Sequence, residues 1–372
     1  LSQFPTPQGS QAIMFSRSFR RTRKSLVAAT IGALVVPLWL VAPTATQSAQ
    51  AASASANLTV ATFNVRCANC SKKPTNSREK RWESRREVIV DQIKSQSVDV
   101  IGLQEASPGL LDSPRISQFE DLLNRLGGDY AVTDSSRYNC TRTDTTFTKC
   151  GGFLDRGASQ DSRIFYRTGR LSLQDSGSLR LDARAIGNGS ARYMAWAQFK
   201  DKRTAKSFIF ATAHFEPGTS SSAIKTRVAQ VKKAISRLNS VNDKKLPIIW
   251  GSDLASSKLS HAGNKSYDAF ISAGFTDPLG NTFKAKNFTS KTYAEKRVNE
   301  QYFTLNNFAA KPKDYVSRGY KLGAHLDYVL IKSAKRVRVT EWEQVLNLTS
   351  SGNFAGVIPS DHNMVKATVV LP

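Results

Sequence analysis

Acidic residues are scarce in this sequence. Its 372 residues include 29 Asp and Glu against 53 Lys and Arg, which gives a formal net charge of +24 at pH 7. Solubility needs far less charge than this, so the excess predicts a polyanionic partner. Nucleic acid, an anionic membrane surface and an acidic cell-wall polymer all qualify, and a cationic surface without a specific partner is the alternative.

Long apolar runs are also rare. The main one, residues 26–42, contains Pro37 and is short for a membrane span. Five bases and no acid precede it, and small residues ending in Ala49-Gln-Ala51 follow. This order is typical of a cleaved secretory signal peptide, with a retained membrane anchor as the alternative. Cleavage leaves a chain of net charge +19 without a transmembrane segment. We expect that chain to be extracellular, with its charge able to hold it at the cell surface.

The remaining length bounds the domain organisation. Residues 1–51 are predicted to be an upstream extension and signal peptide, and residues 52–57 an Ala/Ser-rich linker. Residues 58–372 suit one large α/β domain or two small ones, and they are enough for a full core. A single catalytic domain and a monomer are expected.

Cysteine is sparse, with Cys67, Cys70, Cys140 and Cys150 the four present. In an exported chain they predict two disulfides, for which three pairings exist. Cys67 with Cys70 and Cys140 with Cys150 close the shortest loops and are favoured. A zinc site is the alternative, because Cys67-Ala-Asn-Cys70 has metal-ligand spacing. The wider spacing of the second pair disfavours zinc, and a redox-active pair lacks a thioredoxin-like context.

Short apolar runs are present, and polar residues that carry chemistry end them. Such runs, bounded by turn residues, are typical of buried strands. A polar residue where a strand leaves the core lies at a sheet edge, where α/β proteins build their sites. The pairs are residues 58–63 with Asn64, 100–104 with Glu105, 208–213 with His214, 246–252 with Asp253, and 358–360 with Asp361 and His362.

Helical periodicity appears between these runs. It predicts helices over residues 82–97, 119–126, 224–238 and 267–273, the third with apolar residues at alternating spacings of four and three. The alternation of strands and helices predicts an α/β protein. A mixed sheet, or two sheets packed face to face with helices outside, fits this order.

The polar residues at the strand ends suit one kind of chemistry. Glu105 and Asn64 offer hard oxygen ligands for Mg²⁺, with Mn²⁺ or Ca²⁺ as alternatives. The later strand ends supply acids for metal, a base for water and imidazoles for phosphoryl oxygens. These later residues are His214, Asp253, Asp327, Asp361 and His362. We therefore predict a metal-dependent phosphoester site around Asp253.

The sequence resembles the endonuclease/exonuclease/phosphatase superfamily, which includes deoxyribonuclease I and the apurinic endonucleases. The segments that carry the resemblance are Thr62-Phe-Asn-Val-Arg66, Asp99-Val-Ile-Gly-Leu-Gln-Glu105, Ala213-His-Phe-Glu-Pro217, Gly251-Ser-Asp253, His325-Leu-Asp-Tyr-Val329 and Ser360-Asp-His362. They follow the family's order and span nearly all of residues 58–372. The resemblance implies a four-layer α/β sandwich, with two mixed sheets face to face and helices outside. It also implies a divalent metal and hydrolysis of a phosphoester by in-line attack of water.

The resemblance further implies a role for each matching residue. Glu105 is the expected main metal ligand, with Asn64 and Asp361 beside it. Asp253 is expected to orient and deprotonate the attacking water. The remaining expected roles are His362 on the phosphoryl oxygen, Asp327 on the other ring nitrogen of that histidine, and His214 against the charge that develops on the phosphate.

Three further positions bear on activity. Arg66 and Arg163 are candidates for gripping phosphate, with a solvated surface role as the alternative. The family normally has asparagine two residues after the aspartate that corresponds to Asp253, and here that position is Ala255. The asparagine amide helps to hold the water or phosphate, so we expect reduced but real hydrolysis unless Ser252, Ser256 or a water substitutes.

Three substrate classes follow, in order of preference. A secreted nuclease, acting on DNA with RNA as the alternative, would track phosphates with the basic loop 72–86 and the basic, aromatic segment 280–322. A lipid phosphodiesterase similar to a sphingomyelinase, or a hydrolase of small phosphoesters, comes second, because no apolar docking loop is evident in the sequence. A weakly active or inactive polyanion-binding surface protein comes third, on account of Ala255.

Overall fold

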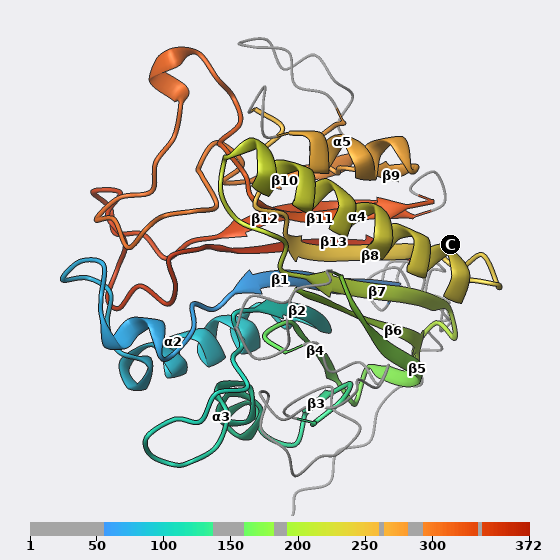
Figure 1. Cartoon of the computed structure of the whole chain (residues 1–372), viewed down its shortest axis with the longest axis horizontal. Helices are drawn as coiled ribbons and strands as arrows, with labels where there is room; N and C mark the ends of the chain where they lie inside the picture. Colours follow the sequence, from blue (N-terminus) through green and yellow to red (C-terminus); the bar gives the residue numbers. More distant parts are fainter. Residues whose placement is uncertain (1–55, 137–159, 182–191, 260–263, 282–292, 334–336) are drawn as a thin grey trace, which may run out of the picture. The chain divides into compact units, whose positions relative to one another are not determined.

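The computed structural model describes residues 56–136, 160–181, 192–259, 264–281, 293–333 and 337–372 (Figure 1). The predicted signal peptide and the predicted Cys140–Cys150 pair lie outside these residues. None of the helices in the described ranges has both the length and the apolar character that crossing a bilayer requires.

The order of the elements matches the alternation predicted from the sequence. The helices are η1 (Cys70–Lys72), α2 (Trp82–Ser95), α3 (Gln118–Leu126), α4 (Ser221–Val241), α5 (Lys265–Ser272) and η3 (Val316–Arg318). The strands in the first half are β1 (Asn57–Asn64), β2 (Val100–Gln104), β3 (Tyr130–Val132), β4 (Arg163–Arg167), β5 (Leu171–Arg180), β6 (Tyr193–Asp201) and β7 (Ser207–Ala213). Those in the second half are β8 (Ile248–Asp253), β9 (Phe275–Thr276), β10 (Ala294–Val298), β11 (Asp327–Lys332), β12 (Arg338–Val345) and β13 (Met364–Val370).

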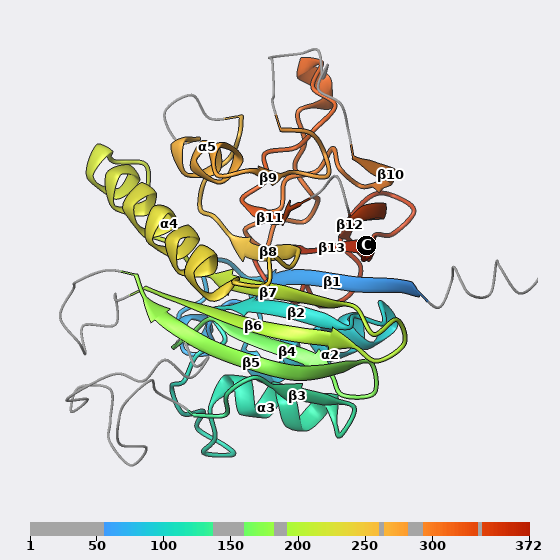
Figure 2. The ribbon, with the colours of Figure 1, turned by 90° about the vertical axis from the view of Figure 1, so that its right-hand side faces the viewer.

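The strands form two mixed sheets. One has seven strands in the order β10-β12-β13-β1-β2-β4-β3, and the other has six in the order β5-β6-β7-β8-β11-β9. Figures 1 and 2 show α2 and α3 beside the first sheet and α4 and α5 beside the second. The four-layer α/β sandwich that the resemblance implied is therefore confirmed.

Three apolar clusters hold these layers together. Residues from both sheets, such as Val60, Ile164 and Phe210, form the central cluster. A second cluster packs α2 and α3 on the first sheet, and a third packs α4 and α5 on the second. Each sheet is thus buried on both faces, which explains why the central strands read as nearly continuous apolar runs.

Glycines allow the sheets to approach closely next to the predicted site. A Cβ added at Gly102 on β2 would lie 2.7 Å from the Gly251 carbonyl oxygen. One added at Gly251 on β8 would lie 3.0 Å from the carbonyl oxygen of Ala61 on β1. Real Cβ atoms essentially never make contacts shorter than 3.0 Å, and contacts of 3.0 Å are rare, so a side chain at either position would force its neighbours to shift.

The segment 280–322 is not a simple loop. Its residues 294–298 form β10, which pairs in parallel with β12 at the edge of the first sheet. The three central residues of this strand are exposed and charged, as is common for edge strands. Because no apolar alternation marks such a strand, the sequence pattern did not predict it.

Candidate active site

Strand register brings the predicted residues to one edge. β1 and β2 run parallel with Asn64 opposite Gln104, so Asn64 and Glu105 emerge side by side. On the other sheet Asp253, which ends β8, lies opposite Asp327, which begins β11. His214 forms a bridge with Asp253 directly after β7. Ends of strands from both sheets therefore meet in one cluster.

Asp253 is the centre of this cluster. Its Oδ2 accepts a hydrogen bond from Asn64 Nδ2 at 3.2 Å and faces the Nε2 atoms of His214 and His362 at 3.7 and 3.8 Å. Its Oδ1 accepts the Ala255 backbone N–H at 2.7 Å. Only 3% of Asp253 is exposed. The buried Oδ2 atom of Asp253 thus faces three side chains that are far apart in the sequence.

His362 has a buried carboxylate behind it. Its Nδ1 donates to Asp327 Oδ2 at 2.8 Å, which turns Nε2 toward Asp253. Asp327 is fully buried, and its Oδ1 has no hydrogen-bond partner among the described residues. A hydrogen bond of this kind fixes the orientation of the imidazole ring.

His214 has an analogous partner that the sequence reasoning missed. Its Nδ1 lies 3.4 Å from Oδ2 of Asp161, whose side chain is 27% exposed. Asp161 stands just before β4, and its carbonyl accepts the Ala106 N–H at 2.9 Å. It belongs to a stretch that looked like an ordinary polar loop, so no sequence signal distinguished it.

Charge sets the protonation of the cluster. Burial alone lowers the pKa of His362, but the charges of Asp327 and Asp253 outweigh it and raise the pKa well above its usual value. Burial also opposes protonation of His214, yet Asp161 and Asp253 raise its pKa as well. Burial works to raise the pKa of Asp253, but the charges of the two histidines lower it overall. Opposite charges on neighbouring groups therefore favour an ionised Asp253 and protonated imidazoles on either side of it.

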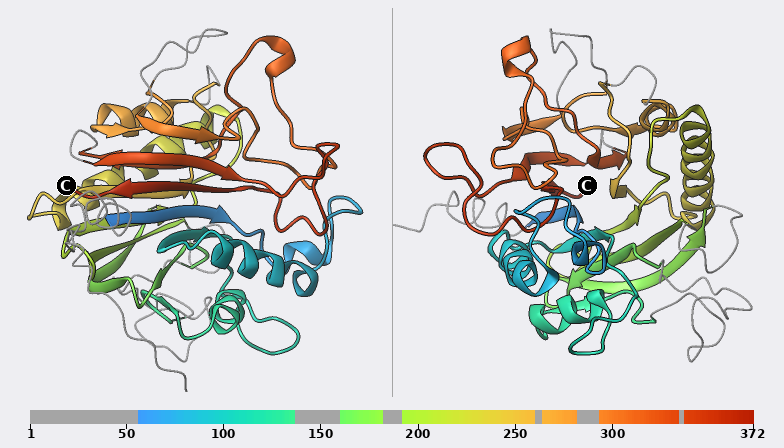
Figure 3. Two further views of the ribbon diagram at one scale, coloured as in Figure 1. Left: turned by 180° about the vertical axis from the view of Figure 1, so that it is seen from behind. Right: turned by 60° about the vertical axis from the view of Figure 1, so that its left-hand side comes forward.

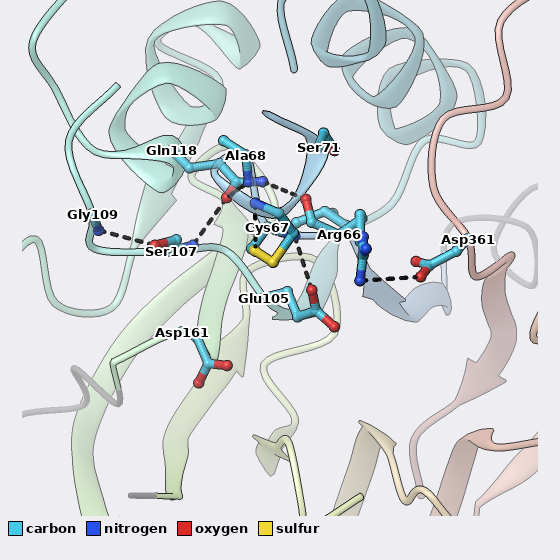
Figure 4. The surroundings of a disulfide bond; sticks show 12 residues. Arg66, Cys67, Ala68, Ser71, Glu105, Ser107, Gly109, Gln118, Asp161 and Asp361 are labelled. Atoms are coloured by element: carbon cyan, nitrogen blue, oxygen red, sulfur yellow. Dashed lines mark hydrogen bonds and ion pairs between the residues drawn. A yellow bond between two sulfur atoms is a disulfide. The ribbon is translucent and has the colours of Figure 1, made fainter. Parts of the chain in front are cut away.

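Glu105 and Asp361 form a second acidic group at the mouth of the site. Glu105 accepts hydrogen bonds from Asn64 Nδ2 at 3.1 Å and from the Cys67 N–H at 2.9 Å. Arg66 NH1 lies 3.7 Å from Asp361 Oδ2. Figure 4 shows the Arg66 guanidinium reaching the Asp361 carboxylate, with Glu105 close by. The predicted neighbours of the metal thus lie together, and Arg66 is among them.

This acidic group fits a hard dication. Burial raises the pKa of Asp361, and the like charge of Glu105 contributes in the same direction, so a cation between them would relieve repulsion. Carboxylate oxygens are the ligands that Mg²⁺ and Mn²⁺ prefer. Asp253, Asp327 and His362 also have ligand atoms within 4.8 Å of one another. The His362 ring, however, faces a carboxylate at each nitrogen, which suits a proton donor better than a metal ligand.

Asn64 has a role besides the expected one. Its Nδ2 donates to Glu105 and Asp253, while its Oδ1 accepts the Arg66 backbone N–H at 3.0 Å. The amide is therefore oriented as a donor that bridges the two carboxylates. Its oxygen keeps a second lone pair, so the role of Asn64 as a metal ligand stays a prediction.

The disulfide between Cys67 and Cys70 is present, as predicted (Figure 4). Its two sulfurs are bonded to each other, so the zinc alternative for this pair is wrong. The Cys67 N–H holds Glu105 in place. The prediction for Cys140 and Cys150 stays open, because both lie outside the described residues.

Arg85, on α2, supports the site, and the sequence patterns did not identify it as a site residue. It is fully buried in α2 and donates to the carbonyl oxygens of Val65, Arg66 and Pro359. It thus ties the segment after β1 to the segment before Asp361. A signal did exist: Arg85 shares the inward face of its helix with Trp82, at a position where an apolar residue is usual.

Residues 304–307 support the last segment of the site. The backbone N–H groups of Asn306 and Asn307 donate to the Asp361 carbonyl at 2.7 and 3.1 Å. Leu305 forms a bridge with His362. Part of the segment that we expected to contact nucleic acid therefore positions Asp361 and His362 instead.

Arg163 does not join the site, and its prediction as a phosphate contact is wrong. The side chain is fully buried and its guanidinium carbon lies 3.9 Å from the centre of the Phe119 ring. Its nitrogens donate to the carbonyl oxygens of Asp134, Ser136 and Gln160. A guanidinium with these partners anchors the ends of a loop and is not accessible to substrate.

Ala255 occupies an unusual backbone position. Its φ is +46°, in the left-handed region that asparagine tolerates better than alanine. The Ser252 hydroxyl donates to the Ala213 carbonyl at 2.6 Å, so it is engaged away from the site. The backbone conformation at this position thus suits asparagine, and alanine supplies no side-chain amide there.

Solved structures of other proteins are similar to this chain, whereas family profiles and curated proteins are not. No protein-family profile matches the sequence, and a search of curated proteins finds no match. Among solved structures, an endonuclease/exonuclease/phosphatase family protein from Bacteroides thetaiotaomicron is similar with a TM-score of 0.58 and 22% identity, covering 85% of this chain and 98% of that one. A mannosyl-6-phosphatase from the same organism has a TM-score of 0.56 and 21% identity, covering 84% and 100%.

A third solved structure is TDP2 from D. rerio complexed with single strand DNA product. Its TM-score is 0.53 and its identity 14%, covering 84% of this chain and 98% of that one. Identities this low establish the fold and leave the activity open. The chain therefore has the fold of endonuclease/exonuclease/phosphatase family proteins, and the resemblance predicted from its motifs is confirmed at the level of the fold.

Proposed function

We propose that this protein is a metal-dependent phosphodiesterase that hydrolyses nucleic acid, with DNA as the first candidate and RNA as the second. The observation that carries the proposal is the arrangement around Asp253. A buried carboxylate with a lowered pKa lies between two histidines whose pKa values are raised, and two further carboxylates stand next to it. In-line hydrolysis of a phosphodiester needs this combination of a base, cationic hydrogen-bond donors and a site for a dication.

The proposed mechanism gives each residue one task. Asp253, ionised at neutral pH, orients the attacking water and accepts its proton as the bond from the water oxygen to phosphorus forms. The bond from phosphorus to the leaving ester oxygen breaks on the opposite side, and that oxygen takes up a proton from solvent. The Nε2–H groups of His362 and His214 donate to phosphoryl oxygens, whose charge grows in the transition state. Asp327 and Asp161 hold the two rings through Nδ1. Because these groups are fixed before substrate arrives, little reorganisation is needed during the reaction.

The metal belongs to the Glu105 and Asp361 carboxylates in this proposal. A bound Mg²⁺ would polarise a phosphoryl oxygen and neutralise the charge that develops there. Asn64 keeps Glu105 at a fixed place relative to Asp253 through its amide nitrogen. Arg66, beside Asp361, is the proposed contact to a non-bridging phosphate oxygen.

A second candidate function is hydrolysis of a small phosphomonoester. The similar structure named as a mannosyl-6-phosphatase supports it, because one fold then accommodates a sugar phosphate. The net charge of +24 favours a polymer of phosphates instead. A binding protein without activity stays the third reading, since Ala255 lacks the amide that the resemblance leads us to expect.

Export to an oxidising compartment completes the proposal. The Cys67–Cys70 disulfide supports it, because such bonds persist mainly outside the cytoplasm. The predicted leader in residues 1–51 supports secretion as well.

The test is a substrate panel on protein that begins at residue 52. Plasmid DNA, single-stranded RNA, mannose 6-phosphate and sphingomyelin are each incubated with Mg²⁺ or with a chelator. Loss of nucleic acid only with Mg²⁺ supports the nuclease, while release of inorganic phosphate alone supports the second candidate. Asp253→Asn, Glu105→Gln and the exposed control Lys233→Gln are run in parallel. Equal activity in all four proteins would refute the site.

A further inference from the structure

Two cavities flank residues 353–358, the segment that precedes the Ser360–His362 part of the site. One has a volume of about 440 Å³ and lies between α2 and residues 345–347. The other has about 450 Å³ and lies between residues 353–358 and the loop after η1. Figures 1 and 3 show that loop, in blue, beside the red segment before β13.

The two cavities differ in charge although they share Phe354, Val357 and Ile358. The cavity against α2 has Asp91 and no base among its lining residues. The other has Arg78 and Lys80 and, within the described part of the chain, no acid. An anion of moderate size is therefore excluded from the first by charge and attracted to the second.

The basic cavity is connected to the active site by one short path. Glu79, between the two cationic residues, points inward and accepts a bond from Arg66 Nε at 3.0 Å. Arg66 in turn faces Asp361 at 3.7 Å. Arg78 and Lys80, on either side of the buried Glu79, are exposed and line the cavity, and Lys80 Nζ donates to the carbonyl of Ser77, another lining residue, at 3.0 Å.

The contacts around the cavity make it a fixed feature. Phe354 N–H donates to the carbonyl of Ala310 at 2.9 Å, and Asn76 Nδ2 donates to the carbonyl of Asn307 at 3.0 Å. The Asn307 N–H reaches the Asp361 carbonyl. Three segments far apart in sequence are thereby joined, and the cations are held at a set place relative to Asp361.

We propose that this cavity is a phosphate subsite for a nucleic acid chain whose scissile phosphate lies at Asp253. The inference rests on the proposed phosphodiesterase function and names its substrate as a polymer. Arg78 and Lys80 would bind a phosphate one or a few nucleotides from the cleaved bond, with its sugar against Phe354 and Val357. Arg66, which contacts Glu79 and faces Asp361, then lies on the side of the scissile phosphate.

A flat membrane surface fits these observations less well. A phosphate and its sugar can enter a concave cavity of about 450 Å³, while a bilayer surface cannot. The apolar lining residues are half-buried or buried rather than projecting. Of the large apolar residues in the described ranges, only Tyr293 and Val316 are exposed, and neither lines this cavity. Membrane docking would require an exposed apolar patch near the cations.

The experiment compares two double variants that each remove two positive charges. Arg78→Gln/Lys80→Gln changes the cavity, and Lys225→Gln/Lys233→Gln changes two exposed positions on α4. Binding of labelled single-stranded oligonucleotides, from a dinucleotide upward, is followed by fluorescence anisotropy. A chelator is present throughout, so binding is measured whether or not the protein hydrolyses the chain.

We expect the cavity variant to bind long oligonucleotides roughly tenfold more weakly and to lose roughly 1.5 from the slope of log Kd against log salt. The deficit should shrink as the oligonucleotide is shortened below the reach of the cavity. The α4 variant should keep the length dependence and most of the slope. Equal losses in both variants, or no loss in the cavity variant, would overturn the subsite.

Two further outcomes separate the subsite from the function on which it rests. If the expected binding pattern is found but no metal-dependent hydrolysis is seen with any nucleic acid, the phosphodiesterase proposal fails and the subsite stands. A third arm uses vesicles of phosphatidylserine. If the cavity variant loses vesicle binding while oligonucleotide binding is intact, the cavity serves a lipid surface and the proposed subsite is wrong.

Discussion

Two histidine–aspartate pairs face the same oxygen of Asp253, and they are buried to different extents. In the pair of His362 with Asp327 the two side chains are 7% and 0% exposed and the hydrogen bond is 2.8 Å long. In the pair of His214 with Asp161 they are 10% and 27% exposed and the distance is 3.4 Å. Both pairs join an imidazole to a carboxylate, so they differ in burial, in geometry and in the positive charge of Arg192, which acts on His214.

This difference in burial affects the strength of the hydrogen bond within each pair. A charged hydrogen bond is stronger in a dry environment, because little water screens it. The pKa of His362 is accordingly raised well above its usual value by Asp327 and Asp253, against the effect of burial. The pKa of His214 rises as well, but its partner Asp161 is less deeply buried than Asp327. The His362 pair is therefore the more shielded of the two.

A third buried histidine shows the effect of burial where burial dominates. His325 is 1% exposed, and its Nε2 bonds to the Glu300 carbonyl at 2.9 Å. Burial, helped by the positive charge of Lys258, lowers its pKa to about 4, although the charge of Asp277 acts in the opposite direction. Burial thus moves the pKa of this histidine in the opposite direction from that of the site histidines. The raised pKa values at the site come from the carboxylates that face the other two rings.

Removal of each site histidine should give the largest effects. We expect His362→Ala to lower kcat for a nucleic acid substrate by roughly 10³-fold, and His214→Ala by roughly 10²-fold, since a fixed cationic donor is lost. Steady-state kinetics with Mg²⁺ measures both, with thermal unfolding as a check that each variant is folded. A larger loss from His214→Ala would reverse the ranking of the two pairs.

Substitution of the two partner aspartates tests directly whether the burial of each pair sets its contribution to kcat. Asp327→Asn should lower kcat by roughly 10²-fold, because it disturbs the ring orientation of His362. Asp161→Asn should lower it by roughly tenfold or less, because water can replace an exposed partner. The pH profile of kcat separates these roles from a loss of folding. If NMR shows the same pKa for His214 in the Asp161→Asn variant as in the unchanged protein, the pairing of His214 with Asp161 is wrong.

The backbone N–H of Ala255 binds Asp253, so a substitution at this position can place an amide beside that carboxylate. It tests whether His214 and His362 suffice for full activity without such an amide. Ala255→Asn restores an amide at a backbone position that asparagine favours, and we expect kcat/KM to rise roughly tenfold. Ala255→Gly is the matched control, since it relieves the φ of +46° without adding an amide. An equal gain from both variants would assign the effect to the backbone. No gain from Ala255→Asn would show that the missing amide does not limit the rate.

The sequence predicted most of this site because strand ends are visible as apolar runs that stop. Asp253 and Glu105 each follow such a run, and parallel pairing of neighbouring strands brings their ends to one edge. The motif order then supplied the fold. What it did not supply was orientation: the bridging role of the Asn64 amide depends on which donors and acceptors surround it.

Other features depended on tertiary contacts that leave no local trace. Asp161 becomes a partner of His214 only because the Ala106 N–H binds its carbonyl and places it beside β2. Arg163 looked like a solvated base, yet three carbonyl groups and the Phe119 ring bury it. A charged residue in a strand can be buried whenever backbone carbonyls satisfy it, and sequence alone does not reveal those carbonyls.

The smallest effect concerns stability, and it tests the third histidine of the comparison. His325 stays neutral in the folded state down to pH about 4, whereas in the unfolded chain it takes up a proton near pH 6.5. Between these values the unfolded state binds more protons, so stability is complete above about pH 6.5 and falls with pH down to about 4. At pH about 5 the loss should be about 2 kcal/mol relative to pH about 7.5. His325→Gln removes this titration and keeps a donor for the Glu300 carbonyl, so its free energy of unfolding in urea should fall by about 2 kcal/mol less over the same range. Identical pH dependence in the two proteins would mean that burial does not hold His325 neutral. The contrast with the two carboxylate-bound histidines would then lose its reference.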